Sequence, residues 1–409
     1  MAIVFPFKAI RPQPQFAAAV AAPPYDVLSS EEARVAAAHA PNSFLHVTKS
    51  EIDMPTTLSI YDQSVYEKAK SNLQQFIDQG VLFKENSDCY YIYELIMDGR
   101  SQTGLVCCSS VDDYENDIIK KHEFTRPEKE QDRINHISIT GAQTGNVFLA
   151  YRNVDQLDQL IVAFKQDHQP VYDFVATDGI SHRIWVVADA ALVNQITTIF
   201  QNDVPCTYIA DGHHRAASAA KVRKAATPGM NTEDDRFLTT LFPANELKIL
   251  PYNRVIKDLN GLSDEAFIAA LQDEFTISTS AAPVDPNALH EFGMYLNGQW
   301  YHLTAKSGTY SDDPIGVLDV TILSNNVFEK LLNIQDQRTD KRIDFVGGIR
   351  GLQELEKRVD SGEMRIAFSF YPVSIQQLFD ISDSGNVMPP KSTWFEPKLR
   401  DGLLTHMIR

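Results

Sequence analysis

Apolar residues occur along this chain in short runs that are typical of β-strands, and polar turns separate these runs. Two of them, Cys89 to Ile96 and Gln102 to Val111, flank Asp98 and Gly99, a pair that favours the tight turn of a hairpin. The same arrangement recurs around Asp178 and Gly179 and around Asn297 and Gly298. The pattern therefore predicts three antiparallel strand pairs spread over the chain.

Helical patterns lie between these strands. Ser29 and Glu32 have the spacing of a capping box, in which each side chain satisfies a backbone N–H at a helix start, and Pro41 ends that helix. Further helices are predicted over residues 61–79 and 191–201 and from Ser263 onward. Because strand pairs and helices do not follow a regular strand–helix–strand rhythm, we expect an α+β fold with mixed sheets and packed helices.

The length of the chain, 409 residues, exceeds that of one ordinary domain. The pattern changes shortly after Pro251, where a hairpin and several short helices follow. We expect an N-terminal α+β region over residues 1–260 and a C-terminal α+β region over residues 261–409. The second region would end in a Pro-broken tail, residues 388–398, that acts as a clamp.

The charge balance is strongly acidic, with 37 Lys and Arg against 54 Asp and Glu and a formal net charge of −17. Such a field repels nucleic acids and anionic membranes, so we expect neither as a partner. No apolar stretch resembles a signal peptide or a membrane span, and the four cysteines lack metal-finger spacing. These features indicate a cytoplasmic protein whose anionic ligands need a local cationic pocket.

One segment, CTYIADGHHRAASAA from Cys206 to Ala220, suggests such a pocket. A short β-branched and aromatic run leads through Asp211 and Gly212 into a helix that begins with His213, His214 and Arg215. Charged cations in a first helical turn oppose the helix dipole at a cost of about 0.3–1 kcal/mol each. A bound phosphate would reverse that sign, because arginine, histidine and backbone N–H groups can all donate to it.

A structural alternative stays open for the same turn, in which Asp211 caps the helix and the histidines pack in the core. If Arg215 instead holds a phosphate, Arg215→Ala is expected to weaken ligand binding and to leave folding nearly unchanged.

Three other segments carry candidate chemistry. The stretch KKHEFTRPEKEQDR is dense in charge, and Glu123 or Asp132 in it could supply a base or a magnesium ligand. The stretch PPYDVLS places Tyr25 and Asp26 between two prolines and a capped helix, as a rigid turn or as substrate contacts. The tail MPPKSTWFEPKL offers Lys391 and Lys398 in a loop.

Four motifs that occur in order along the chain resemble a prokaryotic family catalogued as domain of unknown function 1015. They are APPYDVLS, KHEFTRPEKEQDR with TGAQTGNVFLAYR, YIADGHHRAASA and MPPKSTWFEPKL. The family is in turn similar to the ParB and sulfiredoxin-like superfamily, which includes CTP-binding segregation proteins, sulfiredoxin and free serine kinases. The resemblance implies a ParB/sulfiredoxin-like core around the DGHHR turn, with Gly212, His214 and Arg215 on a nucleotide phosphate and with Asp211 and His213 beside them.

The expected function is phosphoryl transfer between ATP or ADP and a small hydroxyl metabolite, with magnesium and with serine as the first candidate. Phosphoserine hydrolysis and a non-catalytic nucleotide-binding switch are the alternatives. The expected catalytic residues are Asp211, Glu123 and His213. The expected substrate-binding residues are Tyr25, Asp26, His122, Arg126, Arg133 and Lys391.

Overall fold

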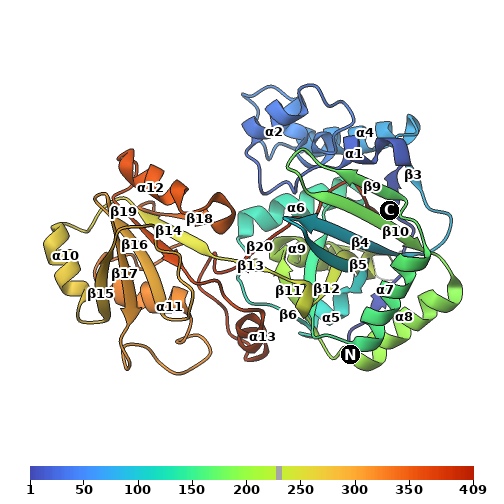
Figure 1. Cartoon of the computed structure of the whole chain (residues 1–409). Helices are drawn as coiled ribbons and strands as arrows, with labels where there is room; N and C mark the ends of the chain where they lie inside the picture. The colour runs from blue at the N-terminus through green and yellow to red at the C-terminus, as the bar shows by residue number, and fades with distance from the viewer. Residues whose placement is uncertain (227–232) are drawn as a thin grey trace. The chain divides into compact units, whose positions relative to one another are not determined.

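The computed structural model describes residues 1–226 and 233–409 and forms two compact units (Figure 1). One unit comprises Met1–Leu247 together with Pro397–Arg409, and the other comprises Lys248–Glu396. This division differs from the boundary at residue 260 that we expected. The strand that follows Pro251 pairs within the second unit, and the last residues of the chain return to the first unit. The described chain is a mixture of helices and several sheets, as the α+β expectation required.

The first unit is built on a nine-stranded mixed sheet in the order β6-β11-β8-β12-β5-β4-β10-β9, with β1 also pairing with β5. β11 runs parallel to β6 and antiparallel to β8, while β12 runs parallel to β8. The strands are β1 Val4–Phe5, β4 Tyr90–Met97, β5 Arg100–Ser110, β6 Ile119–Lys120, β8 Val147–Tyr151, β9 Tyr172–Val175, β10 Ser181–Val187, β11 Thr207–Asp211 and β12 Arg236–Pro243.

Two of the predicted strand pairs belong to this sheet and are confirmed. β4 and β5 pair antiparallel up to Met97 and Arg100, so Asp98 and Gly99 form a two-residue turn. Both turn residues have positive φ, 52° and 77°, which is the backbone conformation that asparagine, aspartate and glycine tolerate best. β9 and β10 likewise pair antiparallel around the turn that contains Gly179.

Three helices pack on one face of the sheet: α7 Asp155–Asp167, α8 Ala190–Asp203 and α9 His213–Ala225. Figure 1 shows α7 and α8 side by side. The shared core includes Leu149 and Ile209 of neighbouring strands with Ile161, Ile196 and Ala216 of the three helices. α9 buries a run of alanines, and such small side chains let its backbone approach the sheet closely.

The last residues of the chain are tied to the same unit. Ala22 and Asp401 exchange backbone hydrogen bonds of 3.1 and 2.9 Å, and Ile10 pairs with Thr405 in the same way. The backbone N–H of Arg400 donates to the Tyr93 hydroxyl at 3.3 Å. The C-terminal segment therefore bridges the sheet and the N-terminal residues, and this places Asp401 beside the segment that carries Tyr25 and Asp26.

A helical layer surrounds the N-terminal residues and includes α2 Ser30–Ala37, α3 Leu45–Thr48, α4 Gln63–Asp78 and α6 Pro127–Thr140. The predicted capping box of Ser29 and Glu32 is present at the start of α2. α4 confirms the helix expected over residues 61–79, and the Asp62 side chain caps it. α6 lies in the charged segment to which the sequence pattern assigned no element. It packs between α4 and α9.

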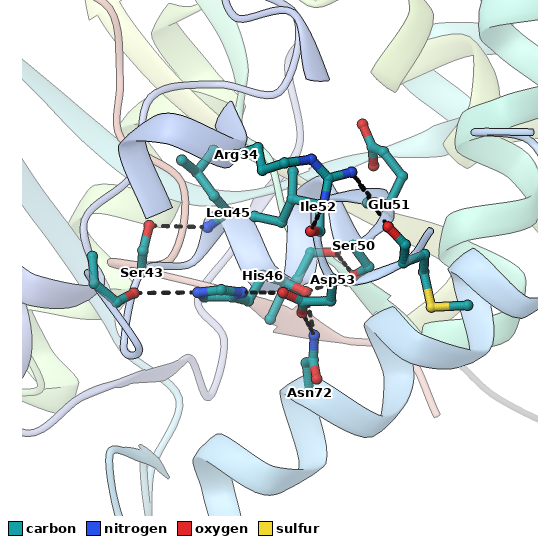
Figure 2. A network of polar contacts seen from close by, with 12 residues as sticks. Arg34, Ser43, Leu45, His46, Ser50, Glu51, Ile52, Asp53 and Asn72 are labelled. Carbon is teal, nitrogen blue, oxygen red and sulfur yellow. Dashed lines mark hydrogen bonds and ion pairs between the residues drawn. The ribbon is translucent and has the colours of Figure 1, made fainter. Parts of the chain in front are cut away.

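Figure 2 shows a polar network that fixes the turns between α2 and α4. The guanidinium of Arg34 donates to the backbone carbonyls of residues 51 and 52. The His46 imidazole contacts Asp53 at 2.8 Å through Nδ1, and the amide of Asn72 donates to the other oxygen of Asp53, also at 2.8 Å. These bonds tie α2, α3 and α4 to the 3-10 helix Ser50–Asp53.

The second unit contains a six-stranded antiparallel sheet in the order β15-β17-β16-β19-β14-β18. The predicted hairpin around Asn297 and Gly298 is confirmed as β16–β17. The strands are β14 Tyr252–Ile256, β15 Phe275–Ser280, β16 Glu291–Leu296, β17 Gln299–Ala305, β18 Ile343–Gly347 and β19 Ile366–Phe370. The helices of this unit are α10 Asp264–Leu271, capped by Ser263, α11 Asp319–Leu323, α12 Gln353–Asp360 and α13 Ile375–Asp383.

The His46–Asp53 pair predicts a pH-dependent stability. The hydrogen bond to Asp53 raises the pKa of His46, and the bonds from His46 and Asn72 outweigh burial and lower the pKa of Asp53. When folding raises the pKa of a histidine, the resulting stabilisation is fully present below about pH 6.5, the value in the unfolded chain. This stabilisation is lost as the pH rises through the pKa of the folded state. We expect His46→Ala to cost about 1 kcal/mol more at pH 5.5 than at pH 8.5, as measured by urea unfolding.

The exposed His39 in the same region offers the control, because His39→Ala removes an imidazole that has no place in this network. A cost of His46→Ala that is equal at the two pH values would contradict the ion pair.

Candidate functional site

The DGHHR turn begins where β11 ends. Gly212 adopts φ 96°, a left-handed conformation that side chains rarely take, and a Cβ at this position would lie 3.3 Å from Cζ of Arg215. Gly212 is the N-cap residue of α9. The Asp211 carboxylate lies 3.2 Å from the ammonium of Lys398 and 3.7 Å from the guanidinium of Arg215.

Arg215 lies in the first turn of α9 and is buried, with 9% of its surface exposed. Its Nη1 donates to the backbone carbonyl of Asn146, and its Nη2 lies 3.4 Å from the Asp26 carboxylate. Its Nε, also buried, has no hydrogen-bond acceptor among the described residues. Arg215 therefore joins three distant segments of the chain and keeps one donor for a further acceptor.

A small pocket, with a cavity volume of about 30 Å³, lies against this guanidinium. Arg133 of α6 lines it too, and its guanidinium carbon lies 3.9 Å from the centroid of the Tyr25 ring. Arg133 donates through Nε and Nη2 to the neighbouring Asp132, at 2.9 and 2.7 Å. The lining residues are Tyr25, Arg133, His136, Ile137, Gln143, Thr144, Gly145, Val147, Arg215, Ala219, Phe237, Leu238 and Asp401.

Asp401 adds a carboxyl group to this pocket, beside the guanidinium groups of Arg215 and Arg133. Its side chain is 2% exposed, and its Oδ2 has no hydrogen-bond partner within the described part of the chain. Burial raises the pKa of Asp401 to about 7, and the guanidinium of Arg215 opposes this shift. Near neutral pH this carboxyl therefore exchanges a proton while it lies beside two buried arginines.

The two histidines of the turn face the loop that connects β6 to α6. Nε2 of His213 accepts the backbone N–H of His122 at 3.4 Å, and Nε2 of His214 accepts that of Arg126 at 2.9 Å. The rings of His122 and His213 meet edge to face, with centroids 4.5 Å apart. Of the three residues expected to share one pocket, Arg215 alone lines it as far as the chain is described, because the histidines bind backbone instead.

The candidate residues of the other segments lie in different parts of the structure. Segment 121–133 approaches the DGHHR turn through the backbone of His122 and Arg126 and through the Arg133 side chain, which lines the same pocket as Arg215. Arg126 is exposed and contributes its backbone N–H, and Glu123 lies in the loop between these two anchors. Lys398 reaches Asp211, whereas Lys391 belongs to the second unit, where its ammonium lies 5.7 Å from the Tyr252 ring centroid.

Sequence reasoning missed Asn146, Gly145 and Asp401. A Cβ on Gly145 would lie 3.3 Å from Oδ1 of Asp401 and 3.4 Å from Cδ of Arg215, so the close approach needs glycine. The stretch TGAQTGNVFLAYR carries part of the family resemblance, and its Gly-Asn pair is the available sequence signal for this close approach. Asp401 precedes a glycine near the chain end, and no pattern there distinguishes it from an ordinary turn residue.

The described residues hold no group of three or more histidine, cysteine, aspartate or glutamate side chains suited to a metal ion. Within the same residues, no helix is long and apolar enough to cross a membrane.

Solved structures resemble this chain only weakly. A free serine kinase variant in complex with AMP shares 12% identity, with 76% of this chain and 92% of that chain covered and a TM-score of 0.37. A conserved hypothetical protein from Pyrococcus furiosus shares 15% identity, with 74% and 94% covered and a TM-score of 0.36. SbnI from Staphylococcus aureus, truncated at its C-terminus, shares 11% identity, with 72% and 85% covered and a TM-score of 0.33.

No curated protein matches this chain. A family model described as "Protein of unknown function (DUF1015)" matches residues 4–321, a range that includes the first three of the four motifs, whereas MPPKSTWFEPKL lies beyond it. The chain therefore belongs to the DUF1015 family.

Proposed function

We propose that this protein transfers a phosphoryl group between ATP or ADP and a small hydroxyl metabolite, with serine as the first candidate. The observation that carries the proposal is the buried Nε donor of Arg215, which has no acceptor among the described residues and belongs to a pocket-lining side chain. A buried donor without an acceptor costs about 1–3 kcal/mol, and a phosphate oxygen supplies the acceptor. In this proposal the turn and its surroundings are a ParB/sulfiredoxin-like phosphate site.

The arginines have the binding role. Arg215 and Arg133 line one pocket, and each already uses part of its guanidinium on a protein acceptor, which fixes the orientation of the rest. The backbone at Gly212 and at the start of α9 adds N–H donors that point along the helix axis. A phosphate between them lies in an environment that stabilises the charge of phosphoryl transfer.

The carboxylates have the proton and metal roles. Asp211 and Asp26 both contact Arg215, and their side chains are 31% and 40% exposed, so a substrate hydroxyl can reach either one. The hydroxyl oxygen attacks the terminal phosphorus, the bond to the nucleotide oxygen breaks, and the proton passes to the carboxylate. Magnesium is typically held by one or two carboxylates and the substrate phosphates, and it would neutralise phosphate charge here with Asp26 and Asp211 as its ligands. Glu123 is the remaining candidate base.

Two alternatives use the same pocket. With phosphoserine as the phosphoryl donor and water as the acceptor, the site would release serine and phosphate. Without a functional base, it would be a nucleotide-binding switch. Both agree with a cytoplasmic location and a small-molecule partner rather than a nucleic acid, and all four cysteines are free thiols.

Turnover separates the enzyme from the switch. We expect Asp211→Asn and Asp26→Asn to retain ADP binding, because the arginines remain, and we expect at least one of them to lower phosphate transfer from ATP to serine by about 10²–10⁴-fold. The measurement is a coupled transfer assay beside calorimetric titration with ADP. Nucleotide binding without transfer above background in the unaltered protein would favour the switch.

Arg215→Lys tests the phosphate contact. Because the guanidinium is buried, donates to the Asn146 carbonyl and contacts Asp26, we expect Arg215→Ala to destabilise folding as well as to weaken ligand binding, instead of leaving folding nearly unchanged. Lysine keeps the charge but loses the Nε donor and the planar fork. We expect ADP to bind about tenfold to a hundredfold more weakly to Arg215→Lys, as measured by titration.

Arg11 offers the matched control, because it is also buried and also donates to a carboxylate, that of Glu85, yet it does not line the pocket. Arg11→Lys should lose stability without losing ADP affinity. Equal losses of affinity in the two variants would refute a specific role for Arg215.

The raised pKa of Asp401 leads us to expect that the protein takes up protons when a nucleotide binds. Because its pKa is about 7, roughly half of these carboxyls are ionised at pH 7, and a nearby phosphate favours the protonated form. We expect uptake of up to about half a proton per ADP bound at pH 7, and affinity that falls as the pH rises above 7. Titration calorimetry in buffers of different ionisation enthalpy measures the uptake.

Asp401→Asn should abolish this part of the uptake. Asp113 is a buried carboxyl whose pKa burial also raises, and it lies outside the pocket lining, so Asp113→Asn is the control. Unchanged proton uptake in Asp401→Asn would exclude Asp401 from the site.

A further inference from the structure

The histidines of the DGHHR turn use their ring nitrogens as hydrogen-bond acceptors. His213 and His214 are the first two residues of α9, and their Nε2 atoms accept the backbone N–H groups of His122 and Arg126. These two amides bracket residues 123–125, so both ends of that short stretch are attached to one helical turn. We call the stretch 122–126 with its two anchors the latched loop.

An acceptor nitrogen requires a neutral imidazole whose proton sits on the other ring nitrogen. The surroundings favour this form: His213 is 7% exposed, and burial lowers its pKa well below the usual range. Burial also lowers the pKa of His122, to about 4. A neutral ring that accepts a backbone N–H avoids the cost of a cation at a helix N-terminus.

The latched loop leads directly into α6. Arg126 is the N-cap residue of this helix, and Pro127 is its first residue. Farther along, Ser218 of α9 donates to the Glu130 carbonyl at 3.0 Å, and Thr125 donates to the Glu130 carboxylate at 2.7 Å. The first turns of α9 therefore hold both the loop and the start of α6, the helix that carries Arg133 to the pocket.

We infer that His213 and His214 are positioning residues that hold the latched loop, with Glu123 in it, and the start of α6 against α9 by accepting the amides of His122 and Arg126. They do not contact the phosphate in this arrangement. The effect on the reaction rests on the proposed function, whereas the latch itself does not.

The test uses three substitutions of His214, which is less buried than His213. Gln offers an amide oxygen close to the position of Nε2 and can accept, Lys can only donate, and Ala can do neither. The readout is hydrogen exchange of the Arg126 amide in the full chain, followed by mass spectrometry. Pro127 has no amide, so the signal at this position is not shared with the next residue.

We expect exchange at Arg126 to accelerate about tenfold or more in His214→Lys and His214→Ala and to remain slow in His214→Gln. His39→Lys, at an exposed histidine of the same unit, should leave this amide unchanged. Protection retained in His214→Lys, unchanged exchange in His214→Ala, or equal exchange in His214→Gln and His214→Ala would each overturn the proposal.

A second readout separates this proposal from the proposed function. If both hold, His214→Gln should keep the ADP affinity of the unaltered protein, and His214→Ala should weaken it because α6 and Arg133 lose their support. If the exchange pattern appears as expected but the unaltered protein binds no ADP, the latch stands and the proposed function fails.

Discussion

The buried guanidinium of Arg215 is the interaction on which the organisation of the first unit depends. A buried charge must be paired and hydrogen-bonded, or it destabilises the fold by several kcal/mol. Arg215 donates to the backbone of Asn146 before β8 and to Asp26 near the N-terminus, and its guanidinium lies 3.7 Å from the Asp211 carboxylate at the end of β11. Because a guanidinium presents its donors in a fixed plane, these acceptors have to arrive in a defined geometry. The turn that carries Arg215 therefore fixes the N-terminal segment relative to the sheet.

The same requirement explains why so acidic a protein keeps its cations and carboxylates together in this region. Lys398 forms an ion pair with Asp211, Arg133 forms one with Asp132, and the carboxyl of Asp401 lines the pocket. Because Lys398, Arg133 and Arg215 already contact carboxylates, an incoming anion would compete with these carboxylates for the cations. The raised pKa of Asp401 makes that competition easier, because this carboxyl can become neutral where the others stay paired. In the proposed function, protonation of Asp401 would therefore raise the affinity of this pocket for an anion.

Local patterns predicted the elements far better than they predicted the site. The hairpins at Gly99 and Gly298 and the capping box at Ser29 depend on residues next to one another, and the structure contains all three. α6 went unassigned because its sequence is dominated by charge, and its buried side depends on contacts with α4 and α9. Asp401 could not be found for the same reason: its burial and its raised pKa arise from residues far away in the sequence. The sequence analysis named Tyr25, Arg133 and Arg215 as candidate site residues, but it gave no contact between them.

The helix dipole disfavours cations at the start of α9, but a histidine is a cation only when both of its ring nitrogens carry a proton. Three potential cations at a helix start would be unfavourable, yet the two histidines act as acceptors, and only Arg215 carries a permanent charge there. That charge is balanced by Asp26 and Asp211, so folding alone accounts for most of the motif. What folding does not account for is smaller and more specific: one buried Nε donor and one buried carboxylate oxygen, both belonging to side chains of the same pocket and both without a partner in the described chain. A ligand that satisfies both must accept a hydrogen bond at one atom and either donate at another or leave Asp401 protonated; in the proposed function a nucleotide phosphate accepts from Nε while Asp401 is protonated.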